Sequence, residues 1–195
     1  VMSDHGFAPY YQKAHLNTWL HQNGYLTLVR PEEMGQHDFL AHVFWRRTKA
    51  YAVGINGLYV NQLGREGKGI VRAGTQHDQV IAEISQKLLK WRDPQNGEQI
   101  VTRVYPRDAV YHGPEAEDGP DLVIGYNRGY RGSDECALGT VSKRAIVPNV
   151  GTWTGDHCMD HTLVPGILLS NRQIDVNDPQ LIDLPVTILN LYGIE

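Results

Sequence analysis

The sequence has little cysteine, no excess of positive charge and no long apolar run. Its 195 residues include two cysteines, Cys136 and Cys158. Two are too few for a disulfide framework, and they lack the Cys-x-x-Cys spacing of a zinc site. The formal net charge of −4 offers no basic surface for nucleic acid. No apolar segment approaches the roughly 20 residues that a membrane-spanning helix needs. We therefore predict no nucleic-acid partner and no membrane segment, and the low cysteine content favours a reducing, cytoplasmic location.

The sequence instead alternates continuous apolar runs with helical periodicities. Helices are predicted for residues 9–23, for the segment from a capping-box-like Thr75 to a stop at Asp93, and from Asp183 to Gly193. Strands are predicted for residues 25–29, 50–54, 58–61, 100–105, 121–125 and 166–170. Residues 127–154 are predicted to form a long surface segment. Continuous apolar strands between helices predict an α/β fold with a mostly parallel sheet.

The least regular part of the chain covers residues 31–74, and we interpret it as an inserted lid or small subdomain. It ends in a glycine-rich loop, Gly64–Gly69. Such a loop can cradle phosphate, but this one lacks Walker A spacing and precedes no clear helix. The loop is therefore predicted to be a structural turn.

Two short stretches carry the side chains that bind transition metals. Asp4 and His5 follow the first residues of the chain, and Asp156 and His157 lie in the loop before residue 166. Carboxylate oxygen and imidazole nitrogen are ligands of catalytic zinc and manganese. The alternative is that the aspartates only stabilise turns and that His157 is an exposed loop histidine. Cys158 is a weaker candidate, because no third group is evident to orient a thiol nucleophile.

Several segments resemble the type I phosphodiesterase / nucleotide pyrophosphatase family of the alkaline phosphatase superfamily. The first is Ser3-Asp4-His5-Gly6-Phe7, which is similar to the superfamily's Asp-His-Gly metal motif. Further similar segments follow in the expected order, at residues 48–52, 58–61, 64–66, 120–124, 154–158, 164–168, 185–189 and 193–194. The resemblance therefore extends over most of the chain.

The resemblance implies a three-layer α/β/α sandwich of the alkaline-phosphatase type, of which residues 1–195 would be the incomplete, C-terminal part of one catalytic domain. It also implies two divalent metal ions, zinc or in some cases manganese. By this resemblance Asp4 and His5 would bind one ion and His157 the other, whereas Asp156 and His161 match no ligand position. The remaining ligands and a Thr or Ser nucleophile would lie upstream, so the chain alone is expected to bind zinc weakly and to be inactive.

The implied substrate is a small-molecule phosphate ester or a nucleotide. Within the superfamily, a phosphomutase, a sulfatase or a phosphonate hydrolase remains an alternative. A non-catalytic binding or assembly domain that keeps the fold is a further one. If upstream strands are missing, the exposed sheet edge and apolar surface should also favour self-association.

Overall fold

The computed structural model describes residues 1–194 and divides the chain into two compact units, described separately below. The larger unit covers Phe7–Val164, and the smaller one combines Val1–Gly6 with the residues from Pro165 onward. The described α-helices are α1 (Leu16–Gln22), α2 (Thr75–Leu89), α3 (Asp134–Ala137) and α4 (Asp183–Leu191). The strands are β1 (Met2–Ser3), β2 (Ala8–Ala14), β3 (Ala50–Ala52), β4 (Gly57–Val60), β5 (Val101–Pro106), β6 (Leu122–Tyr126), β7 (Gly129–Gly132), β8 (Ile146–Pro148), β9 (Gly155–Asp156) and β10 (Ile167–Leu168).

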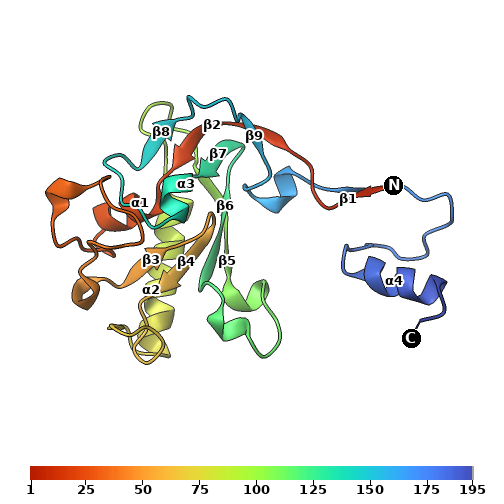
Figure 1. Cartoon of the computed structure of the whole chain (residues 1–195), viewed down its shortest axis with the longest axis horizontal. Coiled ribbons are helices and arrows are strands. Elements are labelled where there is room, and N and C mark those ends of the chain that lie inside the picture. The colour runs from red at the N-terminus through yellow and green to blue at the C-terminus, as the bar shows by residue number, and fades with distance from the viewer. Residues whose placement is uncertain (195) are drawn as a thin grey trace. The chain divides into compact units, whose positions relative to one another are not determined.

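A four-stranded sheet in the order β3-β4-β6-β5 forms one side of the larger unit's core (Figure 1). Helix α2 packs on β5 and β4 through Val80, Ile84 and Leu88, which are buried. The apolar periodicity after Thr75 therefore predicted this helix and its inner face correctly. The capping box is wrong, because Gly74 precedes the helix with φ of 75° and no side chain caps its start.

The second sheet is built around β2, which pairs with β7 on one side and β8 on the other, and also with β9. The predicted helix over residues 9–23 is therefore wrong in its first half, although α1 follows β2 directly and Gly24 ends it with φ of 76°. Residues 8–14 form a strand that pairs with three neighbouring strands, and Ala8, Tyr10 and Ala14, at even spacing, are buried on one face of it. The predicted surface segment over 127–154 is also wrong at β7, whose four residues are all buried.

The strands pair mainly antiparallel, which corrects the expectation of a mostly parallel sheet. Among the named strands of residues 1–194, only β2 and β7 run parallel. A short connection explains the pairing of β3 with β4, because a chain that turns within a few residues can pair its strands only antiparallel. The chain is a mixed α/β protein with several sheets, while residues 25–29 contribute only an isolated bridge between Leu28 and Val43.

Two buried polar side chains connect the elements of the larger unit. The Asn17 amide on α1 donates to the Ala52 carbonyl and accepts from the Ala52 N–H, both at 2.8 Å, so that it pairs with the edge of β3 as a strand would. The Asp121 carboxylate, before β6, accepts from the Val60 N–H at 2.6 Å and from Arg65 at 2.7 Å. Arg107 also donates to Asp121. These contacts join segments that are distant in sequence.

In the smaller unit, β1 and β10 form a two-stranded antiparallel ladder. The predicted strand over 166–170 is reduced to Ile167–Leu168, and it is not buried, since Ile167 is 56% exposed. The predicted last helix forms as α4, but its N-cap is Ile182 and Asp183 is its first residue. Gly193 follows its end with φ of 68°. Within the described residues, no helix has the length and apolar character needed to cross a membrane.

Candidate metal-binding site

Asp4 and His5 lie in the smaller unit, where the chain leaves β1. The Ser3 Oγ accepts a hydrogen bond from the Ile167 N–H at 3.1 Å. Gly166 lies so close to the carbonyls of Ser3 and Asp4 that a β-carbon there would collide with them. The backbone on which Asp4 and His5 stand is thus fixed by the pairing of β1 with β10.

The side chains of Asp4 and His5 offer one oxygen and one nitrogen beside each other. The Asp4 Oδ2 lies 3.4 Å from the His5 Nε2, and the His5 Nδ1 lies 3.0 Å from the carbonyl oxygen of Gly6. The carbonyl only accepts, so the tautomer with its proton on Nδ1 satisfies this contact, and in that tautomer the Nε2 lone pair could bind an ion. A backbone carbonyl that orients an imidazole in this way is the usual partner of a metal-binding histidine.

Asp4 also lines a cavity of about 340 Å³ in the smaller unit, together with Ser3, Gly166 and residues before α4. A cavity of this size lies within the range of small-molecule binding sites. The side chain of Asp4 is 66% exposed, so its carboxylate is accessible to solvent and to an ion.

His157 lies in the larger unit, one residue after β9. Strand β9 pairs with the start of β2, which fixes the backbone on the N-terminal side of His157. The imidazole is 44% exposed, its Nδ1 lies 3.3 Å from the Asp156 Oδ1, and Phe7 packs edge-on against its ring at 5.6 Å. His157 is therefore accessible but held in place.

Asp156 is buried, and its carboxylate accepts hydrogen bonds from the backbone around His157. Its Oδ1 accepts from the N–H groups of His157 at 2.7 Å and Cys158 at 3.2 Å, and its Oδ2 pairs with Arg131. Burial raises the pKa of the Asp156 carboxyl, but the hydrogen bonds from Cys158 and His157 and the charge of Arg131 outweigh it, and the net pKa is lowered. Asp156 is thus an ionised anchor of this turn.

The Asp156, His157 and Cys158 side chains each place a donor atom within 4.8 Å of the others. The thiol is a poor member of this set, because burial and the neighbouring Asp156 carboxylate raise the pKa of Cys158 to about 11. A thiol that stays protonated at neutral pH is a poor nucleophile, and it would have to lose its proton to bind a metal. This agrees with the low rank that the sequence gives to Cys158.

His161 stands on the 3-10 turn η5 (His161–Leu163), where its ring lies 5.6 Å from that of Tyr105. Its neighbour Asp160 is buried and accepts from the Tyr105 hydroxyl at 2.8 Å and from Thr162. These side chains support the turn after His157.

Sequence reasoning missed Arg131, which lies in the segment predicted to be surface. Its guanidinium is 8% exposed and donates to Asp156, and at 2.7 Å to Asp134. The sequence carries no local signal of this role, because the burial of β7 and the two carboxylate partners of Arg131 appear only in the fold.

Comparison with family models gives one match, to type I phosphodiesterase / nucleotide pyrophosphatase, over residues 1–140. The match includes Asp4 and His5 and ends before His157. Searches of curated proteins and of solved structures gave no match. Because the matched range covers most of the 195 residues, the chain belongs to the type I phosphodiesterase / nucleotide pyrophosphatase family.

Proposed function

We propose that this chain is part of a metal-dependent phosphodiesterase or nucleotide pyrophosphatase that acts through two divalent ions, zinc in the first place and manganese as an alternative. The family points to hydrolysis of small-molecule phosphoric esters. The observation that carries the proposal is the Asp4–His5 pair, in which the His5 Nδ1 faces the Gly6 carbonyl and the Nε2 lies beside a carboxylate.

The donor atoms fit the metal by their chemistry. Asp4 Oδ2 and His5 Nε2 would hold one ion, and the His157 imidazole would contribute to the second. When bound, such an ion pair lowers the pKa of an attacking hydroxyl and stabilises negative charge on the phosphoryl oxygens. Two ligands for one ion and one for the other are fewer than the about three that a catalytic zinc uses, so we expect weak zinc binding by this chain alone.

The chain's own residues would orient and support these ligands. With an ion bound at Nε2, the Gly6 carbonyl would accept the proton on the His5 Nδ1, while the Arg131–Asp156 pair holds the turn that carries His157. In the mechanism that we propose, a Thr or Ser from upstream of the Asp-His-Gly segment is the nucleophile. The lid predicted over residues 31–74 could involve only the parts outside β3 and β4, because these two strands lie in the core sheet.

Three substrates distinguish this proposal from its alternatives. We would measure hydrolysis of bis-p-nitrophenyl phosphate, p-nitrophenyl phosphate and p-nitrophenyl sulfate with zinc or manganese, using the chain extended by its native upstream sequence. The proposal predicts the highest kcat/KM for the diester and loss of activity with chelator. Preference for the sulfate would favour a sulfatase, and no hydrolysis of any of the three would favour a mutase or a non-catalytic relative.

A further inference from the structure

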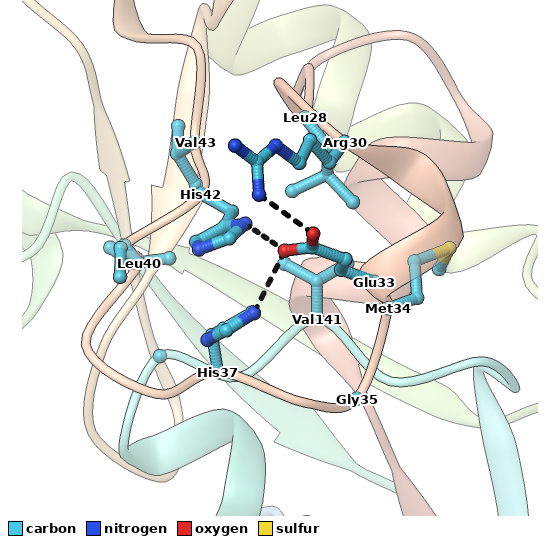
Figure 2. Close-up of a pocket in the computed structure, with 12 residues that line it drawn as sticks. Leu28, Arg30, Glu33, Met34, Gly35, His37, Leu40, His42, Val43 and Val141 are labelled. Carbon is cyan, nitrogen blue, oxygen red and sulfur yellow. Dashed lines mark hydrogen bonds and ion pairs between the residues drawn. The ribbon is translucent and has the colours of Figure 1, made fainter.

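A second group of metal-binding side chains lies in the larger unit, on the loop that follows the 3-10 turn η1 (Pro31–Glu33). Glu33 is the last residue of this turn, and His37 and His42 stand on the loop after it. Figure 2 shows both imidazoles directed at one oxygen of the Glu33 carboxylate and Arg30 directed at the other oxygen. In the sequence, these three residues fall within the irregular segment of residues 31–74.

The two imidazoles converge on one carboxylate oxygen. The His37 Nε2 lies 2.9 Å and the His42 Nδ1 2.8 Å from the Glu33 Oε2. The two rings stack with centroids 3.6 Å apart and planes 12° from parallel. All three donor atoms lie within 4.8 Å of one another. In a tetrahedral zinc site the donor atoms are about 3.3 Å apart and the ion lies near each ring plane. To admit an ion, the three donor atoms would have to adjust and the two stacked rings would have to rotate out of their parallel arrangement.

The loop is anchored so that the two histidines meet. Phe39 and Leu40, which lie between them, have φ of 56° and 55°, in the left-handed region that non-glycine residues rarely adopt. Their N–H groups bond to the carbonyls of Leu138 at 2.7 Å and Gly139 at 3.2 Å, and the Gly35 N–H bonds to Val141. This preorganisation lowers the entropy that ion binding would otherwise cost.

Arg30 and the apolar walls complete the surroundings of the three donors. The Arg30 Nη1 donates to the Glu33 Oε1 at 2.8 Å, which leaves Oε2 for the histidine side. This hydrogen bond is the main reason that the pKa of Glu33 is lowered, and the carboxylate is ionised. Leu28, Leu40, Val43 and Val141 line the same cavity, whose volume of about 20 Å³ has room for about one ion or water.

We propose that Glu33, His37 and His42 bind a single Zn²⁺ ion. Two imidazole nitrogens and one carboxylate oxygen form a ligand set that zinc uses in proteins, with a fourth position left for water. Each imidazole would bind through the nitrogen that now faces Glu33 and keep its proton on the other nitrogen. The bound ion would clamp the loop of residues 33–42 over the segment 138–141. The proposal does not depend on the function proposed above.

Zinc titration by calorimetry tests this site when the other candidate ligands are removed. The background is the full chain with His5→Ala and His157→Ala, so that those histidines contribute no binding. Three further single variants are compared in this background. They are His37→Gln, Glu33→Gln and, as the matched control, His112→Gln at an exposed histidine. Far-UV circular dichroism checks that each variant is folded.

The background should bind one equivalent of Zn²⁺. Loss of His37 should weaken binding more than about 100-fold, because loss of even an outer-shell partner of a metal ligand costs about 10- to 100-fold. Glu33→Gln should weaken binding as well, and it provides the test if His37→Gln fails to fold. The His112→Gln control should bind as the background does. Absence of saturable binding in the background, or equal affinity in the folded His37 and Glu33 variants, would overturn the proposal.

Discussion

Replacing Asp121 with asparagine should destabilise the larger unit strongly, because this carboxylate is the shared partner of several cationic groups. Its side chain is 1% exposed, and its oxygens accept from the Val60 N–H, from Arg65 and from Arg107. His77 adds a contact of 3.0 Å from its Nε2. An amide of the same size can still accept through one oxygen, but it turns an N–H donor towards other donors.

The magnitude follows from the burial of the partners. Breaking a buried ion pair by removing one member costs about 3–5 kcal/mol. The side chains of Arg65 and Arg107 keep 20% and 21% of their exposure, so water can solvate them in part. We therefore expect about 3 kcal/mol, at the lower end. For a chain of this size, that loss corresponds to a fall in Tm of about 6–12 °C.

Thermal unfolding followed by circular dichroism at pH 7 measures this effect, with Asp118→Asn on the exposed turn η4 (Ala116–Asp118) as the control. The control should change the free energy of unfolding by less than about 0.5 kcal/mol. A Tm of Asp121→Asn within about 2 °C of the wild type would refute the reasoning, since one kcal/mol already moves Tm by about that much.

At acidic pH, the difference in unfolding free energy between the wild type and Asp121→Asn should become smaller. Burial raises the pKa of Asp121, but the hydrogen bonds from Arg65, Val60 and His77 outweigh it, and the net pKa is lowered. A lowered folded-state pKa gives stability that is complete above the unfolded value, about 4, and is lost as the pH falls through the folded value. The difference between wild type and Asp121→Asn should therefore shrink below about pH 4. A constant difference down to the acid transition would contradict this assignment.

Three further predictions concern packing and association. Asn17→Ala should lower the free energy of unfolding, measured in urea, by about 1–3 kcal/mol, because it leaves the Ala52 N–H and carbonyl without partners. An unchanged free energy would contradict the role of Asn17 in bonding to the edge of β3. Gly125→Ala should cost about 1–3 kcal/mol, because a β-carbon there would collide with the buried Asp160 carboxylate. Gly67→Ala, which meets nothing, should be neutral. Finally, the chain should self-associate in sedimentation velocity, and a monomer at high concentration would exclude this.

Strong local patterns in the sequence predicted their elements. The apolar residues Val80, Ile84 and Leu88 fall at helical spacing, and α2 buries all three. The predicted hairpin of β3 and β4 also forms, although its connection is residues 53–56 and Gly57 already belongs to β4. In both cases the signal is contained within about 15 residues and needs no distant partner.

The errors occurred where distant partners decide the structure. Residues 8–14 form a strand because β7, β8 and β9 lie beside them, and this pairing is invisible in a local window. Arg131 is buried only because Asp156 and Asp134 receive its charge. The cluster of Glu33, His37 and His42 was missed because backbone bonds to residues 138–141 bring its loop together.

The sequence pointed to the candidate metal ligands through their motifs, but it did not show the contacts that surround them. Asp4, His5 and His157 lie on accessible turns with their imidazoles held by neighbouring groups. The Asp156 carboxylate accepts hydrogen bonds from Arg131 and from two backbone N–H groups. The sequence could not show this, because a carboxylate that binds a metal and one that anchors a turn look alike in sequence. Burial and partners separate the two roles.

Hydrolysis of bis-p-nitrophenyl phosphate with added zinc tests the central proposal most directly. The chain would be compared with a version extended by its native upstream sequence, and the extended version with its His157→Ala variant. The proposal predicts activity in the extended protein only, and its loss in His157→Ala while the fold, measured by circular dichroism, is retained. Full activity in folded His157→Ala would contradict the proposed role of His157, and absence of hydrolysis in the extended protein would contradict phosphodiesterase activity itself.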